Sequence, residues 1–89
     1  MTKEKFKQIV KDGVNRNKEF IVVKIETEGN TAQEIIINPK ENFTPKINYY
    51  LSAYNDDMEL IKAKESGKTI KITDVLMTNN LNDLSWFAY

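Results

Sequence analysis

The chain has 89 residues without cysteine or histidine, and its 13 basic and 13 acidic side chains give a formal net charge of zero. This composition excludes disulfides, thiolate nucleophiles and the usual Cys/His zinc sites, and the length predicts one domain over residues 1–89. No apolar run reaches the roughly 20 residues that span a bilayer, and the opening residues lack the continuous apolar segment of a signal peptide. We therefore expect a cytoplasmic protein.

Apolar residues recur at helical spacing within residues 2–14, which predicts a first helix with Thr2 as its N-cap. Lys3, Lys7 and Lys11 form a charged stripe beside the apolar one. Residues 1–18 carry six bases and two acids, so +4, and the rest of the chain carries −4. A basic helix can contact nucleic acid through these three lysines, but solvated lysine-rich helix faces are common and overall neutrality weakens the attraction to phosphate.

Two runs rich in β-branched residues, Phe20–Ile25 and Gln33–Asn38, flank the turn sequence ETEGNT and predict a β-hairpin. Pro39 ends the second strand because it lacks the N–H that a sheet ladder needs. Residues 68–77 predict a third strand, with Ile70 and Ile72 on one face.

Between the hairpin and the third strand, the sequence predicts a second helix with Thr44 as its N-cap and Pro45 at its first position. Two courses remain open: the helix continues to Ser66, or it breaks at the sequence YNDD and restarts. Gly67 ends it in either case.

The resulting order α-β-β-α-β predicts a small α+β domain with a three-stranded, mainly antiparallel sheet and helices packed on one face. A short helical turn capped by Asn80 is expected near the end of the chain.

The tyrosines of the second helix separate by angle. At 100° per residue, Tyr50, Leu51 and Tyr54 fall on the apolar stripe of this helix and are expected in the core. The other members of the stripe are Ile47, Met58 and Ile61. Tyr49 falls instead near Asp56, with Asp57 beside it, on a smaller face that combines an aromatic ring with acids. Such a surface is typical of protein–protein contacts, whereas a lone surface tyrosine needs no explanation, and both interpretations stay open.

Three aromatic residues, Trp86, Phe87 and Tyr89, lie in the last four positions. They are expected either to close the core or to form an exposed patch that docks a partner or a second copy of the chain.

Catalytic and metal-binding patterns are missing. Asp56, Asp57 and Glu59 are clustered acids, but the residues after them break the calcium-loop pattern, and adjacent helix positions point about 100° apart. There is no histidine to activate a serine, no nucleophile-elbow sequence and no glycine-rich phosphate loop. We expect no enzyme activity, no bound metal and no cofactor.

Residues 48–77, NYYLSAYNDDMELIKAKESGKTIKITDVLM, resemble small uncharacterised proteins encoded by phages and prophages of low-GC Gram-positive bacteria. The shared features are an aromatic helix ending in YNDD, a lysine-rich stretch and a strand of the form Ile-x-Ile-x-Asp. The resemblance implies a small accessory protein in the cytoplasm of a bacterial host, and it assigns no functional residue.

The leading hypothesis is a non-enzymatic phage or mobile-element accessory protein that acts through protein–protein contacts and can form a homodimer. Its expected contact residues are Tyr49, Asp56 and Asp57, with Trp86 and Phe87 as a second choice. The alternatives are a nucleic-acid-binding module that uses the first helix, and an inhibitor similar to phage anti-CRISPR proteins, which share the order helix, hairpin, helix.

Overall fold

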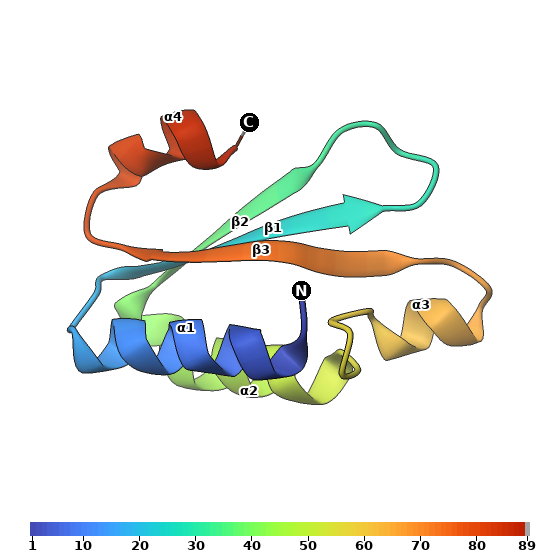
Figure 1. Cartoon of the computed structure of the whole chain (residues 1–89), viewed down its shortest axis with the longest axis horizontal. Helices are drawn as coiled ribbons and strands as arrows, with labels where there is room; N and C mark the ends of the chain where they lie inside the picture. The colour runs from blue at the N-terminus through green and yellow to red at the C-terminus, as the bar shows by residue number, and fades with distance from the viewer. Residues whose placement is uncertain (89) are drawn as a thin grey trace.

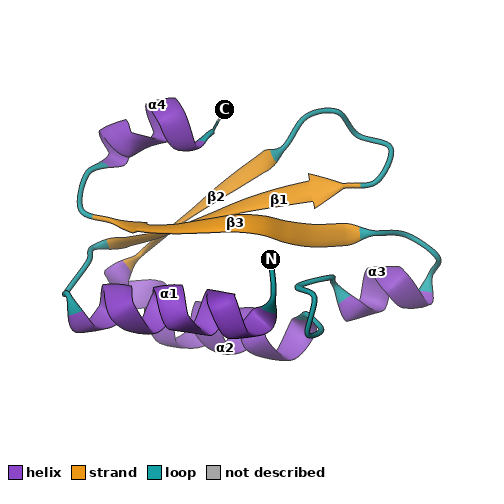
Figure 2. Cartoon of the chain, viewed as in Figure 1, coloured by secondary structure: helices purple, strands orange, loops and turns teal. Residues whose placement is uncertain are grey.

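The computed structural model describes residues 1–88, which form helices, strands and short 3₁₀ turns in an alternating order (Figures 1 and 2). In chain order the elements are α1 (Lys3–Asn15), β1 (Phe20–Thr27), β2 (Glu34–Pro39), η1 (Lys40–Asn42), α2 (Phe43–Ala53), α3 (Ile61–Glu65), β3 (Ile70–Thr78), η2 (Leu81–Asp83) and α4 (Leu84–Phe87). The predicted α+β class, the hairpin and the third strand are confirmed.

The three strands form one sheet in the order β2-β1-β3, and both neighbouring pairs are antiparallel. β1 is therefore central. Its pairing with β3 shifts register between Lys24 and Ile25, where β3 carries an extra residue.

α1 and α2 lie side by side under one face of the sheet (Figure 1). The core between the two layers combines inward residues of all three strands with the apolar stripes of both helices, which is what the alternation of strands and the 3.6-residue helical repeat require. Its buried members are Phe6, Val10, Ile21, Val23, Ile25, Phe43, Tyr50, Tyr54, Met58, Ile72 and Val75.

The two helices of the predicted α-β-β-α-β order, α1 and α2, pack on one face, whereas the short terminal helix α4 lies on the opposite side of the sheet (Figure 1). Its Phe87 is buried, as is Val22 of β1, yet neither belongs to the core under α1 and α2. The ammonium group of Lys24 lies 4.8 Å from the centre of the Phe87 ring. A small patch of the second face is thus covered separately.

The start of α2 lies two residues before the predicted one. The helix begins at Phe43, directly after η1, so Thr44 is not its N-cap and Pro45 is the third helical residue. Pro45 is still tolerated there because the first four N–H groups of a helix have no intrahelical acceptor.

Of the two courses left open for the second helix, the break at YNDD is the one observed. α2 ends at Ala53, and Asn55 organises the turn: its Oδ1 accepts the N–H groups of Asp57 and Glu59 at 3.0 and 2.9 Å. Met58 has a φ of 59° and is fully buried. The chain resumes as α3, whose end is followed by Gly67 at a φ of 79°, as predicted.

Gly13 marks the closest approach of α1 to β3. A Cβ atom built on Gly13 would lie 2.4 Å from Cβ and from Cγ of Met77, and a Cβ carbon cannot approach another carbon that closely. The absence of a side chain at this one helical position therefore sets the distance between helix and strand.

Gly13→Ala provides a test in which two effects have opposite signs. Helix propensity alone would stabilise the variant by about 1 kcal/mol, whereas overpacking against Met77 costs about 1–3 kcal/mol. We expect a lower free energy of unfolding, measured by urea denaturation. Lys11→Ala, at an exposed position of the same helix, is the control and should change the free energy of unfolding little. A more stable Gly13→Ala protein would contradict the close packing.

Candidate protein-binding surface

A groove runs between α1 and α2 on the side of the helices that faces away from the sheet. Its cavity has a volume of about 310 Å³. Seven of the eight residues that line it are apolar or contribute the aliphatic stem of a lysine. The lining residues are Phe6, Lys7, Val10, Lys11, Val14, Asn15, Ile47 and Leu51. Val14 is largely exposed although its helical spacing places it on the apolar stripe, because α2 does not extend far enough to cover it completely.

Two lysines rim this groove. Lys7 and Lys11 are exposed, and neither takes part in the ion pairs found within residues 1–88, which join Arg16 to Asp12 and Lys64 to Glu59. The groove is therefore apolar inside, and the two lysines at its border have no acidic partner among the described residues.

Lys3, the third lysine of the predicted stripe, is used internally. Its Nζ donates a hydrogen bond of 2.7 Å to the carbonyl oxygen of Leu51, in the last turn of α2. A cation at a helix C-terminus also interacts favourably with the helix dipole. Lys3 thus ties α2 to α1.

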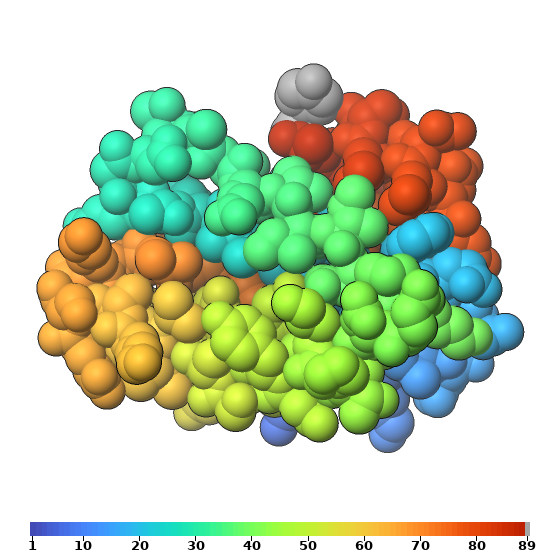
Figure 3. Space-filling view, turned by 180° about the vertical axis from the view of Figure 1, so that it is seen from behind, coloured from blue at the N-terminus to red at the C-terminus, as the bar shows by residue number. Residues whose placement is uncertain are grey.

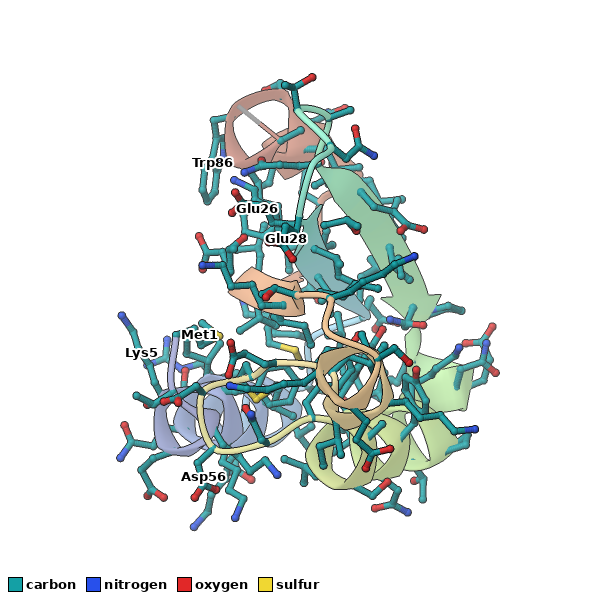
Figure 4. The ribbon with its side chains drawn as sticks, turned by 90° about the vertical axis from the view of Figure 1, so that its right-hand side faces the viewer. Met1, Lys5, Glu26, Glu28, Asp56 and Trp86 are labelled. Carbon is teal, nitrogen blue, oxygen red and sulfur yellow. The ribbon has the colours of Figure 1, made fainter. Side chains whose placement is uncertain are left out.

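Asp56 and Asp57 lie at the N-terminus of α1. The backbone N–H of Lys3 donates to the carbonyl oxygen of Asp56 at 2.8 Å, and both acids line a second cavity with Thr2, Glu4 and Lys7. Figure 4 shows Asp56 below α1, projecting into solvent. The acids therefore adjoin the basic stripe.

The sequence-based grouping of Tyr49 with Asp56 rested on a continuous helix, and it fails because α2 ends at Ala53. Tyr49 is 48% exposed and packs edge-on against Tyr50 and Tyr54, with ring centres 5.5 and 6.2 Å away. At 100° per residue it lies on the side of α2 opposite to Leu51 and hence opposite to the groove. Whether any of these residues binds a partner stays a prediction.

Within the core, Tyr50 and Tyr54 are buried as predicted, and Ile61, assigned to the same stripe, is exposed. The phenol oxygen of Tyr50 accepts a 3.0 Å hydrogen bond from Nδ2 of Asn38, a buried polar residue of β2. Burial raises the pKa of Tyr50, the Asn38 hydrogen bond opposes this rise, and the neighbouring Tyr49 adds to it.

Among residues 1–88 there is no group of three or more acidic side chains placed to hold a metal ion. The pKa of Glu59 is lowered by hydrogen bonds from Lys64 and then from Asn55, which is the effect of a surface ion pair that orders the loop.

Burial, and to a smaller extent the nearby Tyr49, Tyr50 and Glu34, raises the pKa of Tyr54 to about 12 from an ordinary value of 10.0. The folded protein therefore keeps this proton more tightly than the unfolded chain. The stabilisation that comes from the protonated Tyr54 side chain is complete below about pH 10 and is lost as the pH rises towards about 12.

Tyr54→Phe should therefore resist alkaline unfolding. Between pH 10 and 12 its free energy of unfolding should fall by about 2 kcal/mol less than that of the wild type. At pH 8 the two proteins should be similar, because the Tyr54 hydroxyl makes no hydrogen bond within the described residues. Urea titrations at the three pH values measure this. Equal alkaline losses would show that Tyr54 is not the group responsible.

The C-terminal aromatics divide between the two roles proposed for them. Phe87 is 3% exposed and closes the second face of the sheet, whereas Trp86 is 57% exposed and touches Phe87 edge-on. Asn80 caps η2 as predicted, by accepting the N–H of Asn82. Tyr89 lies outside the described residues.

Phe87→Ala should destabilise the protein by about 3 kcal/mol, because it removes a buried ring and leaves a void. Trp86→Ala should cost less than about 1 kcal/mol, because most of that ring is already in water. Urea unfolding followed by circular dichroism compares them without relying on tryptophan fluorescence. Similar losses for the two variants would contradict the assignment of Phe87 to the fold and Trp86 to the surface.

No protein-family model matches the sequence, and no curated protein or solved structure is significantly similar to the chain. Within the part of the chain that the structure describes, no helix has the length and apolar character needed to cross a membrane.

Helical periodicity places Ile47 and Leu51 on the apolar stripe of α2, with the residues expected in the core, so the sequence does not reveal the groove. Both are only partly buried, since they lie on the edge of the α2 stripe that faces α1. One signal was present in the sequence: Lys7 lies three residues before Val10 and Lys11 three residues before Val14, so charge and apolar surface share one side of α1.

Proposed function

We propose that this protein is a non-enzymatic accessory protein, of the phage or mobile-element kind, that binds a protein partner in the groove between α1 and α2. The observation that carries the proposal is the apolar floor between Lys7 and Lys11, which have no acidic partner within residues 1–88. The occupant that fits is an amphipathic helical segment whose apolar face is flanked by acids.

The apolar floor is also the reason to prefer a protein over nucleic acid. Phosphate contacts need several free cations, but Lys3 is bound to the Leu51 carbonyl and the space between Lys7 and Lys11 is lined by aliphatic side chains. Within β1, β2 and β3 the one aromatic residue is Phe20, so the sheet offers no platform for stacking bases.

The binding test uses a designed helical peptide with leucines at positions i, i+3, i+4 and i+7 and glutamates on both flanks. We expect it to bind the wild type and to shift the amide resonances of Val10, Val14 and Leu51. A matched peptide with lysine in place of each glutamate should bind at least about tenfold more weakly, because its charges repel those of the rim.

Reversing the rim with Lys7→Glu and Lys11→Glu together should invert this preference between the two peptides. Lys62→Glu with Lys68→Glu, the same reversal at two other exposed lysines, is the matched control and should leave it unchanged. Equal binding of both peptides by the wild type would contradict the proposed role of the rim. Tight binding of duplex DNA with a steep salt dependence, and no binding of the acidic peptide, would favour the nucleic-acid alternative.

A further inference from the structure

The two edges of the sheet are treated differently. The outer edge of β3 is covered: Leu60 N–H donates to Ile70 C=O at 2.7 Å and Ile72 N–H donates to Met58 C=O at 2.9 Å. Beyond the bulge, the Asp74 carboxylate accepts the N–H of Val75 at 2.9 Å. Loop pairing, a bulge and a local side-chain bond are the devices that protect an edge from pairing with another strand.

The outer edge of β2 has no such cover. Ile70 and Ile72 of β3 direct their N–H and C=O groups away from β1. Their partners in β1, Thr27 and Ile25, therefore direct the same groups to the other side, towards β2. Because this direction alternates from residue to residue along a strand, the pairs that exchange hydrogen bonds between β1 and β2 are residue 25 with 34, 23 with 36 and 21 with 38. It leaves the N–H and C=O groups of Ile35 and Ile37 pointing outwards, and no loop or side chain of residues 1–88 is hydrogen-bonded to them.

The exposed edge is also apolar. β2 carries three successive isoleucines, and Ile37 at its centre is 40% exposed. The strand has one charged residue, Glu34 at its start, and none of the lysines that commonly blunt an edge. Pro39 ends the edge, and its missing N–H is one that would have pointed outwards.

α2 extends this edge into a broader surface. Tyr49 lies on the side of α2 turned away from α1, and the neighbouring Tyr50 is joined to β2 through Asn38. Figure 3 shows this rear face, with the green surface of β2 lying directly above the yellow-green surface of α2. Figure 4, seen along the sheet, shows no other element beyond the outer side of β2.

We propose that β2 pairs with β2 of a second copy of this chain, antiparallel and about a two-fold axis at Ile36, to form a continuous six-stranded sheet. In this register Ile35 and Ile37 of each copy exchange both backbone hydrogen bonds with Ile37 and Ile35 of the other. This pairing covers the β2 edge of both copies. Because the contact uses the same edge on each copy, no further copy can add to it.

The charges of the β2 edge and of the whole chain favour a second copy of this chain as the partner of the edge. With the axis at Ile36, Glu34 of one copy lies opposite the neutral Asn38 of the other, so the two Glu34 side chains are at opposite ends of the contact. The chain has a formal net charge of zero, so two copies approach without net repulsion. Ile35 and Ile37 also meet on one face, which continues the apolar surface across the axis.

Two measurements on the full chain test the dimer. Sedimentation equilibrium should give twice the 10.4 kDa chain mass for the wild type, and Ile37→Lys should restore the single-chain mass. Ile61→Lys is the matched control: Ile61 is 39% exposed, nearly the same as Ile37, but lies on α3, and this variant should stay dimeric. The Lys7→Glu, Lys11→Glu protein should also stay dimeric, which separates this proposal from the groove.

Amide hydrogen exchange in the wild type provides a readout that does not depend on any variant folding. Within residues 1–88 of a single chain the N–H groups of Ile35 and Ile37 have no acceptor, so they should be protected only in the dimer and should exchange faster on dilution. A single-chain mass for the wild type up to millimolar concentration, fast exchange at both positions, or a dimer that survives Ile37→Lys would each overturn the proposal. Loss of the dimer in Ile61→Lys would equally overturn it, because it would place the contact elsewhere.

Discussion

The buried hydrogen bond from Asn38 to Tyr50 is the interaction on which the arrangement of this domain depends. Asn38 is a buried polar residue on the helix-facing side of β2, and its burial is tolerable because its amide N–H donates a hydrogen bond to the phenol oxygen of Tyr50. The bond fixes the rotation of α2 about its own axis. Once Tyr50 points to the sheet and packs edge-on against Phe6 of α1, with ring centres 5.9 Å apart, Leu51 must face α1 and Tyr49 must face the opposite side.

That rotation creates two surfaces of different character on the two sides of α2. On one side, Leu51 and Ile47 meet Val10 and Val14 and form the floor of the groove. On the other, Tyr49 extends the unpaired edge of β2. Both surfaces remain exposed because α2 is short and covers only part of the apolar area next to it. A domain of this size leaves much of its apolar area near the surface.

The sequence predicted local structure well because local structure depends on short-range chemistry. The β-branched runs, the turn before Glu34, the Thr2 cap and Gly67 all act within a few residues, and each was identified. The end of α2 could not be identified in the same way. It depends on the bonds of Leu60 and Met58 to β3, which lie ten or more residues further along the chain. Periodicity extended past Ala53 therefore placed Asp56 on one helix with Tyr49, whereas Asp56 lies in the loop after α2, where its carbonyl oxygen accepts the N–H of Lys3.

The same limit hid the β2 edge. Three isoleucines in a row are typical of a strand buried on both faces, and a sequence pattern does not tell a central strand from an edge strand. Strand order decides this: because β3 returns to pair with β1, β2 is left outermost. In a dimer built on that edge, the two-fold axis passes beside β2, and each α2 separates its own groove from the contact. The two grooves would therefore stay open and point away from the axis, so a partner with two acidic helical segments could engage both copies and gain avidity from the shared scaffold.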